Sequence, residues 1–334
     1  MRVLAQTLRA AYQYETIFYA LLIFLLFPVF LLGFPFYMVP ILFSRGKISG
    51  TAYEPFNGRL LYHLQGSRPD AAALQLAAGL PATNRVFMGL FVRPMVWVSR
   101  ITDYLPDFLD YPPPRPTPMS AMIGARCEFL DKAILDRISG CDQVVILGAG
   151  WDTRAYGLLK GKEVTIFEVD AAATQAVKLS AIARTGLDAA HVNFVSCDFN
   201  RQSWLDALKE NGFDSTKCTF ILWEGVTMYL EEQAIQSTLQ AVSTLPAGSC
   251  IAFDFFSREW LESTLAGKIA SWSVKATYGE PFTFGFPVLP DFPGRLMDYL
   301  KDHGLTLERN RPLGNESELP YGGLVLGVCP ALQC

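Results

Sequence analysis

Downstream of residue 119, short apolar runs alternate with stretches whose apolar residues recur at helical spacing. Runs of this length, bounded by glycine and polar residues, are typical of buried strands. They predict strands at 144–148, 164–169, 192–196, 218–223, 250–256, 305–309 and 322–328, with helices between them over 152–160, 171–184, 201–210, 231–243 and 291–302. This alternation indicates an α/β domain whose mainly parallel sheet is covered by helices on both faces.

The segment 119–139 precedes the first strand and predicts an amphipathic helix, whose apolar side chains fall near one face: Ile123, Phe129, Leu130, Ile134 and Ile138. The sequence YPPPRPTP at 111–118 cannot continue a helix, so it predicts a stiff, extended linker. Residues 48–110 mix helical periodicity with apolar stretches that basic residues and proline interrupt, which favours a helical layer packed on the main domain.

The N-terminus departs from the pattern of a soluble protein, because residues 17–43 contain no charge. A helix of this length can span a bilayer with some tilt. Pro28, Pro35 and Pro40 each remove a helical hydrogen bond and favour a kink. Three interpretations remain open: one kinked transmembrane helix, a hairpin or re-entrant anchor bent near residues 33–35, and an apolar helix buried against the protein.

These patterns divide the chain into a membrane anchor at 1–46, a helical cap and linker at 47–118, and the α/β domain at 119–334. Basic residues flank both ends of the anchor, and their distribution slightly favours the downstream side as cytoplasmic. We therefore expect a membrane protein, with a single-pass or hairpin anchor, whose main domain lies in the cytoplasm.

Composition excludes several partners. The formal net charge of -4 includes no basic block, so nucleic acid is not an expected partner. The seven cysteines contain no CxxC pair, which indicates reduced thiols rather than a disulfide framework. The three histidines, His63, His191 and His303, lie far apart in sequence, and we expect no metal site.

The first predicted strand ends at Gly148-Ala-Gly150, a turn at which a ligand can lie against bare backbone. A dinucleotide-binding fingerprint would place a third glycine at position 153, where this chain has Thr153. This departure disfavours a pyrophosphate ligand. A tight turn without any ligand is the alternative explanation of the two glycines.

Acidic residues follow the next three predicted strands. Glu168 and Asp170 end the second strand, and a carboxylate at this place can accept both hydroxyls of a ribose. Asp198 follows the third strand, within reach of an adenine amino group. For Asp170 and Asp198 the alternative role is helix capping. Glu224 leaves the buried fourth strand, where its charge needs a cation or a hydrogen-bond donor.

A glycine turn followed by three acids suits a nucleoside without phosphates, and S-adenosylmethionine, with its cationic sulfonium, fits this description. We assign the catalytic end of the pocket to Glu224 and to Tyr229, close behind it; core packing is the alternative role of Tyr229 and Met228. Asp254, in the fifth strand, is a further candidate for contact with the substrate.

The motifs GAGWDTR, FEVD and WEGVTMYL, in this order and spacing, resemble the leucine carboxyl methyltransferase family, and within it a bacterial and fungal branch of S-adenosylmethionine-dependent methyltransferases. The resemblance covers about residues 120 to 256. It implies a class I methyltransferase (Rossmann-like) sheet of seven strands, whose last strand, near 322–328, is antiparallel.

The resemblance also implies roles for single residues. Arg126 would meet the carboxylate of the cofactor, and Gly148 and Gly150 would lie under its methionine part. Asp170 would bind the ribose, Asp198 the adenine amino group, and Glu224 the end nearest the substrate. Arg154 also follows the motif, either as a structural ion pair or as a ligand contact.

Methyl transfer requires alignment of the acceptor and exclusion of water. None of the histidines follows a strand end in the predicted site, which favours a carboxylate or an acidic hydroxyl as the acceptor, since neither depends on a strong base. The aromatic segment 257–290 should close over the pocket together with part of 48–115. Beside a membrane anchor, this arrangement predicts an O-methyltransferase acting on a lipophilic small molecule.

Alternatives remain. Residues 1–46 and 48–115 differ from the soluble, phosphatase-modifying members of the family, so specificity for a protein C-terminal leucine is not carried over; a protein C-terminal carboxyl methyltransferase stays an alternative. A membrane-tethered, non-catalytic nucleoside-binding protein is another. An NAD-dependent oxidoreductase is disfavoured, because the third glycine and a Tyr-x-x-x-Lys arrangement are missing.

Overall fold

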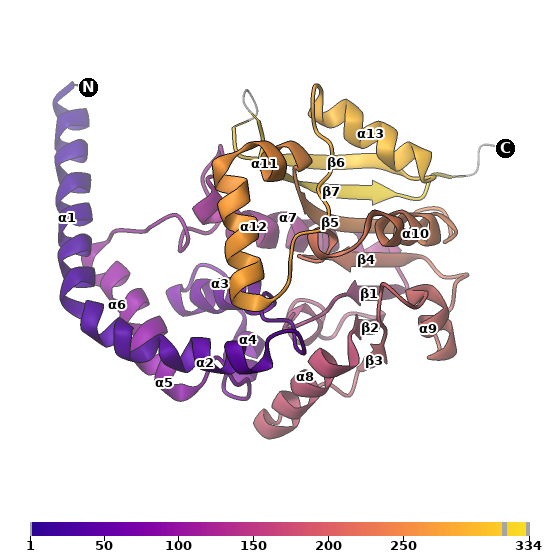
Figure 1. The fold of residues 1–334 in the computed structure, drawn as a ribbon, viewed down its shortest axis with the longest axis horizontal. Helices are drawn as coiled ribbons and strands as arrows, with labels where there is room; N and C mark the ends of the chain where they lie inside the picture. Colours follow the sequence, from indigo (N-terminus) through magenta and orange to yellow (C-terminus); the bar gives the residue numbers. More distant parts are fainter. Residues whose placement is uncertain (1, 316–318, 332–334) are drawn as a thin grey trace.

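A seven-stranded sheet forms the centre of the protein in a computed structural model that describes residues 2–315 and 319–331 (Figure 1). Its strands are β1 (Gln143–Leu147), β2 (Thr165–Asp170), β3 (Val192–Ser196), β4 (Thr219–Trp223), β5 (Cys250–Phe256), β6 (Thr306–Leu313) and β7 (Gly322–Val328). They are ordered β3-β2-β1-β4-β5-β7-β6. Strands β1 to β5 pair in parallel, and β7 pairs antiparallel with both β5 and β6, so among these strands only β7 runs in the opposite direction to the rest. The predicted class I methyltransferase sheet is therefore confirmed.

Alternate residues of each strand point to opposite faces of the sheet, and helices bury both faces. In β1, Val144 and Ile146 belong to one apolar core, and Val145 and Leu147 belong to the other. The first core includes residues of α3 (Tyr53–Gln65), α7 (Met122–Arg137) and α8 (Ala172–Thr185). The second includes residues of α9 (Trp204–Glu210), α10 (Glu232–Ser243) and α13 (Phe292–Asp302).

The predicted helix over 152–160 is wrong. The chain forms only a 3-10 turn, η4 (Arg154–Tyr156). The Asp152 side chain accepts a hydrogen bond from the Arg154 amide at 2.7 Å, a local contact that competes with helix formation. Gly161, at φ +77°, then turns the chain towards β2. The helix predicted over 201–210 begins only at Trp204, because Ser203 caps it, and β6 continues past the predicted end at residue 309 to Leu313.

The apolar N-terminus forms two helices, α1 (Arg2–Gly33) and α2 (Pro35–Ser44). The chain bends between them and does not reverse (Figure 1). Residues 13–44 are long and apolar enough to cross a membrane, and an 18-residue part of them has a mean hydropathy of 2.7 and is only 11% buried in the protein. The interpretation as a helix buried against the protein is therefore wrong.

The downstream half of α1 rests on α6 (Arg93–Thr102) and on the π-helical turn η1 (Met88–Val92). Gly33 permits the contact, since a Cβ atom there would lie 2.9 Å from Leu90 Cβ. Phe30 and Phe91 stack edge to face at 5.2 Å between ring centroids. Further contacts lie on both sides of the bend: Tyr19 of α1 meets Tyr104, and α2 meets α5 (Arg85–Phe87) and α12 (Leu265–Tyr278).

Residues 47–118 form the predicted helical layer, with α3, α4 (Ala71–Ala77), α5 (Arg85–Phe87), η1 and α6. Phe56, Leu60 and Leu76 of this layer share one core with Val144 and Ile146 of β1. The linker predicted at 111–118 contains no helix. The helical layer therefore packs directly on the sheet, at the edge of the cavity described next.

Candidate active site

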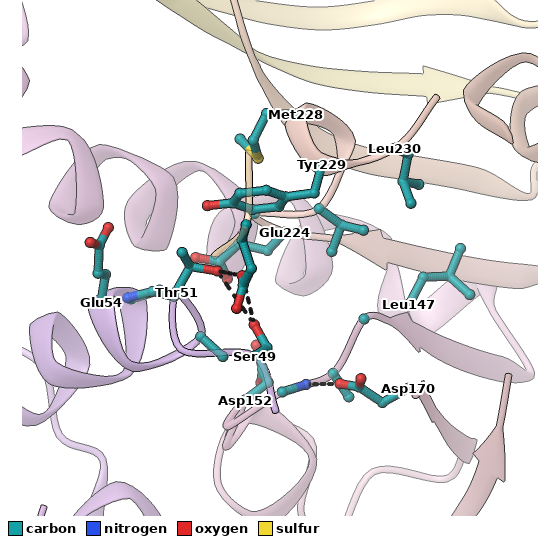
Figure 2. Close-up of a pocket in the computed structure, with 18 of the residues that line it drawn as sticks. Ser49, Thr51, Glu54, Leu147, Asp152, Asp170, Glu224, Met228, Tyr229 and Leu230 are labelled. Carbon is teal, nitrogen blue, oxygen red and sulfur yellow. Dashed lines mark hydrogen bonds between the residues drawn. The ribbon is translucent and has the colours of Figure 1, made fainter. Parts of the chain in front are cut away.

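A cavity of about 510 Å³ opens at the carboxyl ends of β1, β2 and β4 (Figure 2). Its floor is the turn Gly148-Ala149-Gly150. Its other walls are the start of α3 with the segment preceding it, α12 (Leu265–Tyr278), and the loop that follows α12. In open α/β sheets, ligands bind at this edge. The predicted closure of 257–290 and part of 48–115 over the site matches this arrangement.

The two glycines of the floor are required by geometry. Gly148 and Gly150 adopt φ values of +67° and +42°, a region that side chains strongly disfavour. A Cβ atom on Gly148 would lie 2.4 Å from a methyl group of Val226, and one on Gly150 would lie 2.9 Å from Ala52 Cβ. The bare backbone leaves the remaining space above the turn for a ligand.

Asp170 lies beside this floor. Its carboxylate accepts hydrogen bonds from the amides of Gly150, at 2.5 Å, and Ala171, at 2.6 Å. Burial raises the pKa of Asp170, and these two amides partly offset that effect. Asp170 does not cap α8, whose N-cap position is Ala171. The capping alternative is therefore wrong for this residue, which faces the cavity.

Glu168, the other acid of β2, does not line the cavity. Its carboxylate is buried and pairs with Lys178 Nζ at 2.6 Å. Burial nevertheless raises the pKa of Glu168 above its ordinary value. Of the two acids that end β2, only Asp170 is therefore placed to meet a ligand in the cavity.

Asp198 lies at the rim of the cavity with a side chain that is 51% exposed. Its carboxylate accepts from the Asn200 amide at 3.1 Å and lies 3.5 Å from Arg201 Nε. The cap of α9 is Ser203, so the capping alternative for Asp198 is also wrong. Asp198 and Asp170 end neighbouring strands and line the same side of the cavity.

Glu224 lies at the centre of a buried charge network. Its carboxylate oxygens lie 2.5 Å from Arg154, 3.2 Å from Arg59 and 3.4 Å from Arg126. Burial alone would raise the pKa of Glu224, but the three guanidinium groups outweigh it and lower the pKa to about 2. The cation that the sequence required for Glu224 is therefore supplied by the protein itself.

Arg154 is fully buried beneath the cavity and pairs with Asp131 at 2.6 Å, and also with Asp152 and Glu224. Of its two predicted roles, the structural ion pair is the one observed. Asp254 does not line the cavity, contrary to its role as a substrate contact. It lies 3.3 Å from Arg126 and accepts from the Gly225 amide at 2.6 Å, so it positions Arg126.

Several buried polar atoms around Glu224 make no hydrogen bond within the described residues. They are Arg59 Nε, Arg126 Nε and Nη2, and Glu224 Oε1. Arg126 Nε does have an ion-pair partner in Asp254, at 3.3 Å, and Arg126 Nη2 has one in Glu224 Oε1, at 3.4 Å, but neither contact is a hydrogen bond. Buried donors and acceptors without hydrogen bonds are costly unless a ligand completes them. Arg59 and Arg126 offer donors to a carboxylate, and Glu224 offers an acceptor to an ammonium group. These residues therefore fit the amino-acid end of S-adenosylmethionine.

Tyr229 and Phe282 both line the cavity, and the centroids of their rings lie 5.5 Å apart. Its hydroxyl points towards the side of the cavity where Thr51 and Glu54 lie (Figure 2). Burial raises the pKa of Tyr229 far above its ordinary value, so it is an uncharged hydrogen-bond donor rather than a base. Tyr229 therefore lines the cavity, and its place at the catalytic end stays a prediction.

Among the cavity residues that were not identified in the sequence are four that carry polar or charged groups: Thr51, Glu54, Arg59 and Glu280. A signal for Arg59 exists, because it lies three residues after Phe56 on the apolar face of α3, where a charge is unexpected. Nothing in the sequence connects Glu280 with Thr51. The Thr51 hydroxyl nevertheless donates to the Glu280 carboxylate, across 229 residues of chain.

Comparisons with known proteins agree with these features. Residues 84–243 match the family model described as leucine carboxyl methyltransferase. A relative from Mycobacterium sp. (strain JLS) is 31% identical over 205 residues, which cover 57% of this chain and 67% of that protein. A relative from Mycolicibacterium paratuberculosis is 39% identical over 129 residues, which cover 38% of this chain and 41% of that protein. Both carry the name "Putative S-adenosyl-L-methionine-dependent methyltransferase".

The matched regions are partial, since this chain spans less than two thirds of the length of the Mycolicibacterium relative and of a Bacillus subtilis relative of the same description, where it covers 45%. Among solved structures, a methyltransferase-like protein from Thermobifida fusca aligns over 82% of this chain and 94% of its own, with 13% identity and a TM-score of 0.47.

Proposed function

The chain belongs to the leucine carboxyl methyltransferase family of S-adenosylmethionine-dependent methyltransferases, and we propose that it methylates a carboxylate or hydroxyl oxygen of a lipophilic small molecule. The observation that carries this proposal is the cavity itself. A glycine floor, the carboxylate of Asp170 and buried polar atoms of Arg126 and Glu224 that make no hydrogen bond within the described residues surround one space. When bound there, S-adenosylmethionine supplies an activated methyl group.

The protein contributes position and charge. Asp170 would hold the ribose, Asp198 the adenine amino group, and Arg59 and Arg126 the carboxylate of the cofactor. Six carboxylates and two guanidinium groups line the cavity: Glu54, Asp152, Asp170, Asp198, Glu224 and Glu280, with Arg59 and Arg126. An acidic surround of this kind favours a cofactor of net positive charge. Alignment and exclusion of water would then contribute most of the rate acceleration.

The proposal includes a membrane location, with α1 and α2 as the anchor and the catalytic domain in the cytoplasm. Support comes from large apolar side chains that the protein leaves uncovered, including Phe24 at 77%, Leu25 at 69% and Phe43 at 85% exposure. A soluble monomer rarely exposes a continuous apolar surface of this kind. A lipophilic acceptor could then reach the cavity from the bilayer beside it.

Calorimetry with the purified full chain in lipid nanodiscs tests the cofactor. We expect binding of S-adenosylmethionine and of S-adenosylhomocysteine, and none of NAD. Incubation with methyl-labelled cofactor and a membrane lipid extract, followed by mass identification of the product, then tests the transfer. An unlabelled lipid fraction beside efficient labelling of water-soluble acceptors by a chain without residues 1–44 would contradict the lipophilic acceptor.

A further inference from the structure

A second cavity, of about 190 Å³, lies where α1 and α2 meet the helical layer. We call it the hinge groove; its wall is almost entirely apolar and includes Phe34, Tyr37, Leu61, Phe87, Phe91 and Met95. Tyr37 stacks on Phe87 at 4.9 Å between ring centroids, and Phe87 stacks on Phe91 at 5.3 Å. These stacked rings give the groove a fixed shape. No part of the described chain fills it.

Glu54, in the first turn of α3, lines both the hinge groove and the large cavity. Its side chain can be reached from these two spaces, although protein atoms surround it on the other sides. Burial among the surrounding protein atoms raises the pKa of Glu54, which a hydrogen bond from Tyr278 and the charge of Arg126 only partly offset. Glu54 thus lies between an apolar groove and a reaction cavity, and it forms no salt bridge among the described residues.

The acceptor side of the large cavity is apolar apart from its acids. It is lined by Met119, Met122, Phe256, Ala270, Val274 and Phe282. The arginines of the cavity pair with Glu224, Asp152 and Asp254 on the cofactor side. Glu54 and Glu280 therefore face this space with their negative charges unpaired by arginine. A carboxylate acceptor would have to enter beside two like charges, whereas an uncharged hydroxyl would not.

We infer that the acceptor is an uncharged hydroxyl compound with an apolar tail, that the tail lies in the hinge groove, and that Glu54 takes the hydroxyl proton. This inference rests on the proposed function. Of the two acceptor groups proposed there, a carboxylate and a hydroxyl, it retains the hydroxyl. Glu54 lines both the groove and the reaction cavity, and the groove wall also includes Phe34 and Tyr37, at the bend between α1 and α2 and in α2. The groove therefore lies between the apolar N-terminal helices and the reaction cavity, where a lipid-soluble molecule from the anchor would arrive.

The reaction balances with the groups named. The acceptor O–H bond breaks and its proton passes to the Glu54 carboxylate, while an oxygen lone pair forms the new bond to the methyl carbon. The carbon–sulfur bond of the donor breaks, and its electron pair stays on sulfur. The products are a methyl ether, S-adenosylhomocysteine and protonated Glu54, which returns its proton to water. General-base assistance of this kind contributes roughly 10²–10⁴-fold in rate.

The test uses the full chain in phosphatidylcholine nanodiscs, with three probes: 4-nonylphenol, 4-nonylbenzoic acid and phenol. Methyl-labelled donor shows the transfer, and the label in an ester is released as methanol by mild base, whereas a methyl ether is stable. We expect ether formation on 4-nonylphenol, little ester formation on the acid, and a KM for phenol at least about tenfold higher, because burial of each methylene contributes about 0.8 kcal/mol.

Two variants test the groove. Met95→Trp should fill it and raise the KM for 4-nonylphenol about tenfold without changing the phenol reaction or the Kd of S-adenosylmethionine. Ile101→Trp is the matched control, because Ile101 lies on the same helix, is 45% exposed and is remote from the groove wall. An unchanged KM in Met95→Trp would overturn the placement of the tail.

Glu54→Gln tests the base. The groups that face Glu54 are Tyr278, Tyr37, Tyr229, Arg126 and Glu280. In the wild type, kcat for 4-nonylphenol should fall as the pH drops through the raised pKa of Glu54. The variant should lose this acid limb and most of kcat, and keep its donor affinity. Faster transfer to the acid than to the phenol, or no transfer to the phenol by a chain that binds the donor, overturns the inference. Failure to bind the donor overturns the proposed function instead.

Discussion

The backbone amide of Gly50 donates a hydrogen bond to Glu280 Oε1 at 2.7 Å, across 230 residues of chain. The other carboxylate oxygen of Glu280 accepts from Ser49 at 3.3 Å and from Thr51. One side chain therefore joins the segment after the N-terminal helices to the loop after α12. Both segments line the cavity, so the hydrogen bonds of Glu280 close the wall between them.

Glu280→Ala should loosen this closure. Three acceptor contacts are lost, at a cost of roughly 1–3 kcal/mol for the polar groups left behind. We expect faster hydrogen exchange at the Gly50 amide and a higher Kd for S-adenosylmethionine. Glu262→Ala, on the exposed surface of α11 (Arg258–Ser263), is the control and should change neither quantity. Equal exchange rates in the two variants would show that the contact does not hold the segment.

Asp170→Ala should abolish measurable binding of S-adenosylmethionine in calorimetry. The loss of hydrogen bonds between a carboxylate and two ribose hydroxyls costs about 1.5–3 kcal/mol for each bond. Asp188→Ala removes an exposed acid that forms an ion pair with Lys160, at 3.3 Å, and should leave the affinity unchanged. An unaltered Kd in Asp170→Ala would remove the ribose assignment.

Gly148→Ala and Gly161→Ala form a matched pair, because both glycines have positive φ values, +67° and +77°. Alanine costs roughly 1–2 kcal/mol at either position through the backbone alone. Only Gly148 has a neighbour in the way, the Val226 methyl group. Urea unfolding should therefore show Gly148→Ala as less stable than Gly161→Ala by a further amount of about 1–3 kcal/mol. Equal stabilities would mean that Val226 moves aside freely.

Glu224 should contribute to the pH dependence of stability. Its pKa is lowered from 4.5 to about 2 in the folded protein, so its contribution is present above pH 4.5 and is lost as the pH falls towards 2. Glu224→Gln should lower the free energy of unfolding at neutral pH by roughly 3–5 kcal/mol, because buried guanidinium groups lose a partner. Between these pH values the stability of the variant should fall less steeply. Parallel curves for the two proteins would contradict this assignment.

Leu25→Lys should weaken membrane attachment. Lysine at the centre of a transmembrane helix costs about 2.5–3.5 kcal/mol on insertion scales. Leu25 is 69% exposed on α1, and Leu135→Lys, at a 49% exposed site on α7, is the control. After carbonate extraction, the first variant should appear in the soluble fraction more than the wild type, and the control should not. Equal partition of all three proteins would count against an inserted α1.

The sheet could be predicted from sequence because each strand is a short apolar run, buried on both faces and bounded by turn residues. The acids at the strand ends were found for the same reason, since a carboxylate after a buried strand needs a partner. Choosing between Glu168 and Asp170 required the structure. The two residues are two positions apart and share a face of β2, but Glu168 lies inside the strand and pairs with Lys178, whereas Asp170 is its last residue and lines the cavity.

Other features depend on contacts between distant parts of the chain. Arg154 follows a strand end like a ligand-binding residue, but it meets Asp131 of α7 beneath the cavity. Glu54 and Glu280 belong to segments with no motif, and they reach the site only because the helical layer and the loop after α12 fold over the sheet. Sequence spacing carries no information on such closure.

Ala52 lies over Gly150, close enough that a single added carbon on the glycine would touch it. This alanine stands only eight residues beyond the end of α2, on the stretch that Glu280 clasps. The wall above the glycine turn is therefore a short continuation of α2 along the chain. With α1 and α2 held in a bilayer, as proposed, a change in their tilt would act on Ala52, and the thickness and fluidity of the bilayer would then affect how quickly S-adenosylhomocysteine leaves.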